Sequence, residues 1–437
     1  MSTGRNEGKQ LFKFIHAADI HLDSPLLNLD QYDGAPVESL RVATREAFDN
    51  LIQLAIDEQV AFVLIAGDLY DKDSPDFNTP RHVREKFREL ERANIQVHII
   101  QGNHDAGTHA KRAFEALTFP DNVHVYSTKK PESRHIEELQ VAIHGQGFAN
   151  RSVDEDLSSN YPMAEPGYFN IGMLHTNLGG NASHDNYAPS TREGLLTKDY
   201  QYWALGHIHK RDKGIGGSRQ LIHYPGNTQG RHIRETGEKG CTLVTVDDSL
   251  NISTKFRALD VWRWQQCEID ATSLQHTDDI FDEVQRTLEK HLKAADDRSL
   301  AVRVILKGQT PAHRTLLSGH DAFRDQLRRM IMDNFDDRVW LEKLVLKTKH
   351  PTAQTSEQRG EAHGELIAAI YDVTPTEDVF ADVREELEKA LKAIPSDARL
   401  AHLCIDLNDE ATAKTLVEDA CDLLAARLLD SPEEDLA

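Results

Sequence analysis

The 437-residue chain has few cysteines, no long apolar run and no excess of positive charge. Its four cysteines form no Cys-x-x-Cys pair, which argues against a disulfide framework and a thiolate zinc site and favours a reducing cytoplasm. The longest apolar run covers the eight residues 60–67, far fewer than the roughly 20 that a membrane helix needs. The first ten residues are polar, without the apolar segment of an export signal. We therefore expect a cytoplasmic protein without membrane association.

The formal net charge is −22, from 50 Lys and Arg against 72 Asp and Glu, which argues against a surface that coats nucleic acid generally. The charge is uneven, because residues 357–437 hold 7 basic and 21 acidic residues, or −14 of the total. The acidity thus belongs mostly to the C-terminal tail. It says little about what the preceding residues bind.

Runs rich in Val, Ile, Phe, Leu and Tyr recur along the first 250 residues, as is typical of strands. They cover residues 11–17, 60–65, 96–100, 140–143, 169–174 and 202–205. Between them, residues 39–58 and 79–93 carry apolar side chains at helical spacing. This alternation predicts a layered α/β domain over residues 11–260. Three further strands, expected as antiparallel additions, are predicted at 220–224, 241–246 and 252–258.

A smaller α+β domain is predicted over residues 261–348. It has strand patterns at 262–269, 300–306 and 339–347 and helix patterns at 277–293 and 322–334. Its Trp262, Trp264 and Trp340 are expected in a core or interface rather than as platforms for bases. The remaining predictions are a linker at 349–364, a helical region at 365–430, and disorder at 1–10 and 431–437.

Five polar clusters directly follow predicted strands. They are Asp19–His21, Gly67–Asp71, Gly102–Asp105, His175 and Gly206–His209. Ligands of open α/β sheets bind beyond the carboxyl ends of the strands, so we expect the five clusters to meet in one crevice. The pairs Asp19/His21 and His207/His209 have i, i+2 spacing, which directs both side chains to one side of an extended backbone. Each cluster alone could be a turn, a surface loop or, for His175, a core histidine.

Together the clusters offer two carboxylates, one amide oxygen and four imidazoles, and no sulfur: Asp19, Asp68, Asn103, His21, His175, His207 and His209. Such a set suits Mn, Fe, Zn or Co better than Ca. It exceeds the needs of one catalytic ion and fits two ions that share a carboxylate, for which Asp68 is the natural candidate. Two divalent ions and two carboxylates leave a charge of about +2, which favours a phosphodiester and a metal-bound hydroxide.

These clusters, with the segments Phe14–Pro25 and Tyr224–Asn227, resemble the calcineurin-like metallophosphoesterase superfamily. Within it, they are most similar to the DNA-repair nuclease branch of the bacterial SbcD/YhaO type. The resemblance covers residues 11 to about 260, and beyond that only the order of domains agrees. It implies an α/β sandwich of sheets flanked by helices, a small α+β capping domain and a helical C-terminal region.

The resemblance also implies residue roles. Asp19, His21, Asp68 and His209 would hold a first metal, and Asp68, Asn103, His175 and His207 a second, with manganese preferred. His104 would stabilise the transition state or protonate the leaving oxygen, and Asp105 would orient His104. Archaeal and eukaryotic relatives have a histidine in place of Asp71, so any role of that histidine at DNA ends does not transfer to this chain.

Substrate and partner contacts are predicted more broadly. Candidate DNA contacts are Lys210, Arg211, Tyr224, Asn227 and Arg231, although the basic residues could equally be solvated loop charges. The helices at 39–58 and 79–93 could form a homodimer contact as in relatives, or simply pack on the sheet. The C-terminal helices could dock on the coiled coil of an SMC-like ATPase, or form a hairpin packed on the capping domain.

The sequence therefore predicts a two-metal DNA nuclease that acts in repair with an ATPase partner. It would be a 3′-to-5′ exonuclease with some single-strand endonuclease activity. Two alternatives stay open: a phosphodiesterase or phosphatase for small substrates, and a non-catalytic scaffold that binds DNA or the ATPase.

Overall fold

The computed structural model describes residues 12–24, 35–71, 78–107, 118–179, 188–296 and 298–349, together with the single positions 114, 351, 370, 420, 421 and 424. The predicted N-terminal disorder, linker, C-terminal helical region and acidic end lie almost entirely outside the described residues. The chain divides into two compact units. The first comprises residues 1–266, 291–303 and 335–342, and the second comprises 267–290, 304–334 and 343–437.

Two six-stranded sheets form the centre of the first unit. The first sheet has the order β12-β11-β1-β2-β3-β4, with bounds Ile252–Ala258, Gly240–Val246, Phe12–Ala17, Phe62–Ala66, Gln96–Ile100 and Val123–Val125. The second has the order β5-β6-β7-β8-β10-β9, with bounds Glu132–Ile136, Val141–Gly145, Phe169–His175, Tyr202–Gly206, Gln220–His223 and Ile215–Gly217. β11 and β12 are antiparallel additions as expected, but β10 pairs with β8 in parallel, contrary to the prediction.

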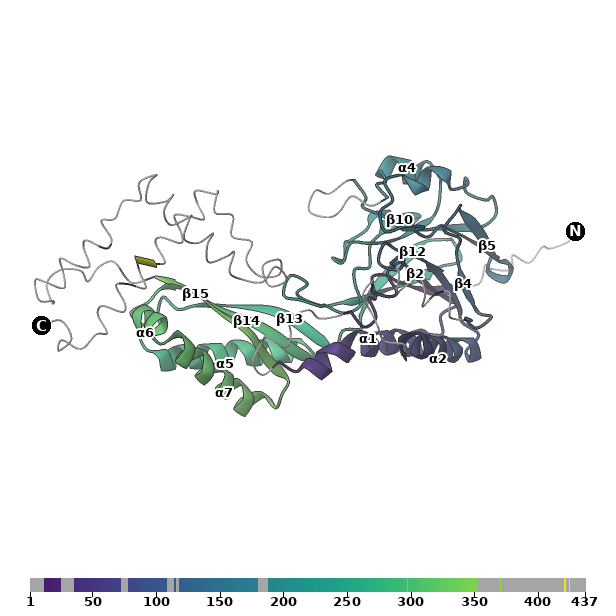
Figure 1. Ribbon diagram of the computed structural model, residues 1–437. Helices are drawn as coiled ribbons and strands as arrows, with labels where there is room; N and C mark the ends of the chain where they lie inside the picture. Colours follow the sequence, from purple (N-terminus) through teal and green to yellow (C-terminus); the bar gives the residue numbers. More distant parts are fainter. Residues whose placement is uncertain are drawn as a thin grey trace, which may run out of the picture. The chain divides into compact units, whose positions relative to one another are not determined.

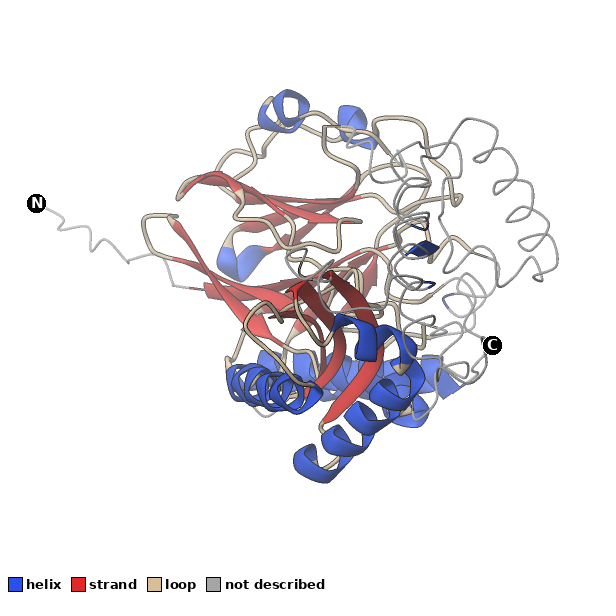
Figure 2. Cartoon of the chain, turned by 90° about the vertical axis from the view of Figure 1, so that its left-hand side faces the viewer, coloured by secondary structure: helices blue, strands red, loops and turns tan. Residues whose placement is uncertain are grey.

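This unit has four layers: a layer of two helices, the first sheet, the second sheet and a layer of short helices (Figures 1 and 2). Helices α1 (Val37–Asp57) and α2 (Asn78–Arg92) cover the outer face of the first sheet, where Phe48 and Phe87 pack on Ile15 and Ile65. Between the sheets lie aromatic side chains, with the rings of Phe14 and Phe62 stacked at 4.9 Å. The outer face of the second sheet is covered by η3 (Leu157–Asn160) and α4 (Arg192–Leu196). The predicted layered α/β architecture is confirmed.

Burial on both faces explains why the strand signals in the sequence were strong. In β1, Ile15 and Ala17 belong to the core beneath the helices, whereas Phe12 and Phe14 belong to the core between the sheets. Parallel strands covered on both sides have near-continuous apolar sequences, which stand out from their surroundings. The short edge strands β4, β5 and β9 have many partly exposed residues and were not predicted.

A three-stranded sheet of order β13-β14-β15 follows, formed by Trp262–Asp270, Ser299–Gln309 and Val339–Lys349. Its helices are α5 (Thr277–Ala294), α6 (His313–Ser318) and α7 (His320–Phe335), of which α6 was not predicted. The three tryptophans Trp262, Trp264 and Trp340 are buried in one cluster, as predicted. Among the helices of the described segments, none is long and apolar enough to cross a membrane.

Candidate metal centre

The seven candidate ligands leave the two large sheets at the carboxyl ends of β1, β2, β3, β7 and β8. In chain order they are Asp19 and His21, Asp68, Asn103, His175, and His207 with His209. β1 to β3 belong to one sheet and β7 and β8 to the other. The seven residues, called the metal centre below, therefore gather where the ends of both sheets meet.

In the turns that follow these strands, four of the ligand residues have a backbone conformation in or near the left-handed region. The φ angles are 51° at Asp19, 48° at His21, 53° at Asp68 and 99° at His207. Side chains other than glycine seldom adopt positive φ, and such strain persists only where the surroundings enforce it. Two backbone hydrogen bonds do so here, from Asp19 N to Gly67 O (3.1 Å) and from His21 N to Asp68 O (2.9 Å). The i, i+2 pairs thus converge through tight turns, and the prediction of an extended backbone was wrong.

Two glycines let the strand ends approach each other closely. A Cβ at Gly206 would lie 1.8 Å from the carbonyl oxygen of Ala66, and one at Gly67 (φ 92°) would lie 2.2 Å from His175 Nδ1. No real Cβ contact is that short, so both positions require glycine. The ends of β2 and β8 therefore lie close together, and His175 Nδ1 lies 2.9 Å from Ala66 O at the end of β2.

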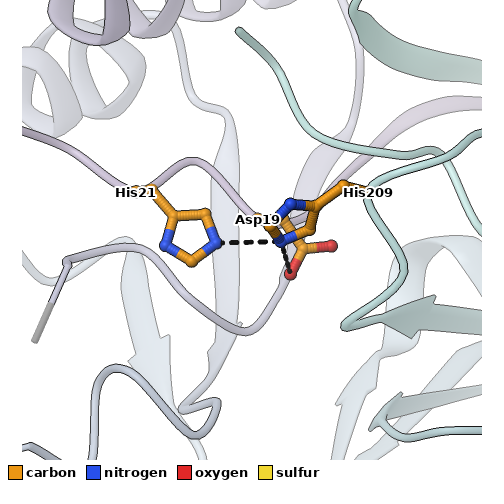
Figure 3. Close-up of side chains that lie close together, drawn as sticks. All are labelled: Asp19, His21 and His209. Atoms are coloured by element: carbon orange, nitrogen blue, oxygen red, sulfur yellow. Dashed lines mark hydrogen bonds and ion pairs between the residues drawn. The ribbon is translucent and has the colours of Figure 1, made fainter. Parts of the chain in front are cut away.

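One half of the centre consists of Asp19, His21 and His209 (Figure 3). His209 Nε2 lies 3.2 Å from His21 Nε2 and 3.9 Å from Asp19 Oδ1. His21 Nε2 also lies 3.6 Å from Asp68 Oδ2. With Asp68 included, four ring and carboxylate atoms from the ends of β1, β2 and β8 thus lie close together.

The other half is formed around His175. Its Nε2 lies 2.9 Å from Asn103 Oδ1 and 3.5 Å from Asp68 Oδ2, and its ring centroid lies 5.3 Å from that of His207. Asp68 Oδ2 therefore stands between His21 and His175, the place expected of a bridging carboxylate. The structure brings all seven predicted ligands together.

The hydrogen bonds behind the imidazoles show that this arrangement fits metal ions. His175 Nδ1 faces the carbonyl oxygen of Ala66 at 2.9 Å and His209 Nδ1 faces a Glu235 carboxylate oxygen at 2.6 Å, so each Nδ1 carries the proton. In the neutral rings, each Nε2 is then unprotonated and carries a lone pair. Those lone pairs face further acceptors, Asn103 Oδ1 at 2.9 Å and Asp19 Oδ1 at 3.9 Å, an arrangement that either a metal ion or a second ring proton would satisfy.

The charges of the centre agree with this. Burial lowers the pKa of His175, but the Asp68 and Asp19 carboxylates and the Ala66 carbonyl together raise it, to about 9. Burial raises the pKa of Asp68, yet the neighbouring imidazoles His175 and His21 hold that pKa well below its usual range. The site thus attracts positive charge, which protons supply without metal and which divalent cations would supply when bound.

His104 is oriented by a different carboxylate from the one predicted. Its Nδ1 lies 3.1 Å from Asp71 Oδ1. Asp105, expected in this role, instead accepts backbone N–H bonds from Gly102 (3.0 Å), Leu69 (3.2 Å) and Tyr70 (2.9 Å). Asp105 therefore ties together the turns after β2 and β3. Burial and the Asp68 charge raise the pKa of Asp105 to about 7 despite those bonds.

The substrate candidates divide into exposed and buried groups. Lys210 and Arg211 are exposed, and the Arg211 guanidinium lies 3.8 Å above the ring of Phe256. Tyr224 is buried, and its hydroxyl donates to Thr176 O (2.8 Å) and accepts from Leu178 N (3.0 Å). Asn227 is buried and donates to Gln229 O and to Glu235. Tyr224 and Asn227 support the site from within, so their prediction as substrate contacts was wrong.

Glu235 was missed by the sequence reasoning, and Arg231 was placed with the DNA contacts. Both lie next to the centre, where Arg231 Nη1 is 3.3 Å from Asp71 Oδ2 and Arg231 Nη2 is 3.5 Å from Glu235 Oε1. Their only sequence signal was their position shortly after the Tyr224–Asn227 segment.

Family models match two stretches of the chain. Residues 12–211 match the calcineurin-like phosphoesterase model, and residues 264–349 match the middle domain of metallophosphoesterase YhaO. The chain belongs to the calcineurin-like metallophosphoesterase family, whose members hydrolyse phosphoesters at a dinuclear metal site.

Among its relatives is the uncharacterized metallophosphoesterase YhaO of Bacillus subtilis, 36% identical over 302 residues that cover 68% of this chain and 72% of the relative. The DNA double-strand break repair protein Mre11 of Sulfolobus acidocaldarius is 23% identical over 396 residues, which cover 87% of this chain and 97% of that protein. A solved dimetal phosphatase from Danio rerio matches 57% of this chain and 96% of its own, at 13% identity and a TM-score of 0.35.

Proposed function

We propose that this protein is a manganese-dependent DNA nuclease of DNA repair, which removes nucleotides from 3′ ends and also cuts single strands. The observation that carries the proposal is the gathering of seven candidate ligands at the strand ends, with Asp68 Oδ2 lying 3.6 Å from His21 Nε2 and 3.5 Å from His175 Nε2. The relationship to DNA double-strand break repair proteins directs the proposal toward DNA rather than small phosphoesters.

In this proposal Asp19, His21, Asp68 and His209 hold one metal ion, and Asp68, Asn103, His175 and His207 hold the other. When bound, such ions would supply Lewis-acid stabilisation of negative charge on a phosphoryl group and activation of water. The chain's own residues fix the remaining geometry. Backbone N–H groups of His207 and His104 donate to Asp19 (3.1 Å) and Asp68 (2.9 Å), which sets the direction of both carboxylates.

His104 supplies the acid in this scheme. Burial lowers its pKa, but the hydrogen bond with Asp71 and the charge of Asp68 outweigh burial, so its pKa is raised. With one proton on Nδ1 toward Asp71, the protonated ring carries its other proton on Nε2, and the side chain is 24% exposed. That proton goes to the leaving 3′ oxygen.

The proposal includes partners. The protein would act in the cytoplasm as a homodimer, with α1 and α2 as the contact, and with an SMC-like ATPase bound by the helices predicted at 365–430. Support comes from the resemblance and from the apolar spacing of those segments, in a tail that carries most of the negative charge.

A cleavage assay tests the proposed activity. Full-length protein is incubated with single- and double-stranded DNA labelled at the 3′ or 5′ end, with Mn²⁺ or Mg²⁺, beside a chromogenic phosphodiester. We expect Mn²⁺-dependent release of the 3′ label, loss of cleavage in Asp68→Ala, and full activity in Asp154→Ala, an exposed aspartate outside the centre. Rapid turnover of the small ester with intact DNA would instead indicate a small-substrate phosphodiesterase.

A further inference from the structure

We propose that Arg231 and Glu235 are positioning residues that, with Asp71, form an ion-pair bridge between the imidazoles of His104 and His209. The three residues are called the positioning bridge below. One end of the bridge holds the ring assigned above as the acid, and the other end holds a ring of the metal centre. The inference rests on the proposed metal centre and adds to it residues that lie outside its ligand set.

The Glu235 end of the bridge fixes the tautomer of His209. Glu235 Oε1 lies 2.6 Å from His209 Nδ1, and the carboxylate is buried. Donors surround both of its oxygens: Oε2 accepts from Asn227 Nδ2 at 3.0 Å and from the Arg231 backbone N at 2.8 Å, and Arg231 Nη2 faces Oε1 at 3.5 Å. An ionised carboxylate only accepts hydrogen bonds, so the proton of a neutral His209 stays on Nδ1. Its Nε2 is then available to a metal ion, and the ring cannot rotate away.

The Asp71 end of the bridge fixes His104. Asp71 Oδ1 accepts from His104, and Asp71 Oδ2 accepts from Ser24 Oγ at 2.7 Å and faces Arg231 Nη1 at 3.3 Å. Both oxygens of this buried carboxylate are therefore occupied. Asp71 cannot turn without losing the contact to Arg231.

Arg231 joins the two ends. Its Nη1 faces Asp71 and its Nη2 faces Glu235 Oε1 at 3.5 Å, while its backbone N donates to Glu235 Oε2 at 2.8 Å. The planar guanidinium reaches two carboxylates at once in fixed directions, which the single ammonium group of lysine does not. Asp71 and Glu235 are carboxylates outside the ligand set. Arg231 supplies the positive charge that balances their negative charges.

The segment that carries Arg231 and Glu235 is held firmly. Asn227 Nδ2 donates to Glu235 Oε2 (3.0 Å), Gln229 Nε2 donates to Trp262 O (2.6 Å), and Trp264 Nε1 donates to Gly230 O (3.0 Å). Asn227 and Gln229 are buried. The bridge is thus built in advance of substrate binding, as positioning groups require.

Manganese binding without substrate tests the Glu235 end. Titration calorimetry and manganese EPR on the full chain should show two ions per wild-type molecule, with a coupled spectrum. In Glu235→Gln we expect one of the two affinities to fall by about 10- to 100-fold, the usual effect of removing such a partner. At limiting manganese the variant should show the uncoupled spectrum of a single ion. Glu165→Gln, which removes the charge from the His135–Glu165 pair (2.6 Å) outside the centre, should behave as wild type.

Steady-state kinetics test the Arg231 end. Arg231→Lys keeps the positive charge but loses the planar guanidinium that contacts Asp71 and Glu235 at the same time. We therefore expect kcat to fall at least tenfold with little change in KM. Excess manganese should not restore kcat. The matched control is Arg263→Lys, because Arg263 is also buried and holds the Asp260 carboxylate (2.9 Å) away from the centre. Thermal unfolding of all variants separates a loss of positioning from a loss of folding.

The outcomes distinguish the bridge from the proposed function. Wild-type protein that binds no pair of manganese ions would overturn the metal centre itself. If wild type binds two ions and Glu235→Gln binds them equally well, or if Arg231→Lys keeps full kcat, the bridge is wrong and the centre stands. Equal losses in the Glu165 and Arg263 controls would also overturn the bridge, because the effect would then be general.

Discussion

His104 and Asp71 form a hydrogen-bonded pair, with 3.1 Å between Nδ1 and Oδ1, at the edge of the metal centre. The two residues come from turns after different strands, β3 and β2. Asp71 is also held by Ser24 and Arg231, so it is a fixed negative charge beside the ring. This relationship raises the pKa of His104 and keeps the imidazole ready to donate a proton.

Asp71→Asn tests that relationship. The amide can still accept a hydrogen bond from Nδ1, but it removes the charge that stabilises the imidazolium. We expect kcat for DNA cleavage to fall by about 10²-fold, at the lower end of the range for general acid catalysis. Manganese affinity, measured by calorimetry, should change much less. Unchanged kcat would remove Asp71 from the mechanism.

His104→Asn addresses the acid itself. Cleavage should be abolished, because asparagine cannot transfer a proton to the leaving oxygen, whereas manganese binding should stay near that of wild type. Metal content and cleavage are measured on the same preparation. Loss of both ions in this variant would contradict the role of His104 and place it among the ligands.

Most of the centre was predictable because its signals are local. Parallel strands buried on both faces give continuous apolar runs, and each run here ends in the cluster that supplies the ligands, as at Ile65–Asp68. The rule that ligands gather beyond the carboxyl ends of such strands then brings the clusters together without knowledge of the strand order.

The errors concern contacts that have no local signal. Asp105 was assigned to His104 because the two are adjacent in sequence, but the partner is Asp71, 33 residues earlier. Glu235 pairs with His209 across 26 residues of chain. The sequence Tyr-Pro-Gly-Asn gave no sign that its tyrosine and asparagine point inward. Backbone turns such as those at Asp19 and His21 are set by hydrogen bonds to the neighbouring strand end, which spacing alone does not show.

Gly206→Ala tests the close approach of the strand ends. The new Cβ would lie 1.8 Å from Ala66 O and 2.8 Å from His175 Nδ1. The chain must shift, which we expect to cost about 1–3 kcal/mol of folding stability, as overpacking does, and to displace His175. Chemical denaturation and manganese titration should both report losses. Gly217→Ala, which meets nothing within 4 Å, should change neither.

Lys210→Ala tests the exposed basic residues that follow the last ligand pair. If the ammonium contacts a phosphate, DNA affinity should fall and the slope of log K against log salt should decrease by about 0.7–0.9. The measurement is a salt series of binding to single- and double-stranded DNA in the inactive His104→Asn background. An unchanged slope would return Lys210 to the solvated loop charges.

His98 predicts a pH dependence of stability that is independent of the metal centre. It is buried between the sheets, where its Nδ1 lies 3.1 Å from the hydroxyl of Tyr126. Burial, assisted by the charges of His124 and Arg134, lowers the pKa of His98 from 6.5 to about 3. Between these values the folded protein keeps His98 neutral, whereas the unfolded chain takes up a proton. The contribution of His98 to the free energy of unfolding is therefore fully present above about pH 6.5 and decreases as the pH falls toward 3.

His98→Asn retains a donor toward Tyr126 and removes this titration. Urea denaturation at several pH values from 7 to 4, with a chelator present, measures the effect. The wild-type free energy of unfolding should fall more steeply than that of the variant, by up to about 1.4 kcal/mol per pH unit well below 6.5. His276→Asn, at an exposed histidine, should keep the wild-type slope. Parallel curves for wild type and His98→Asn would mean that folding does not lower the pKa of His98.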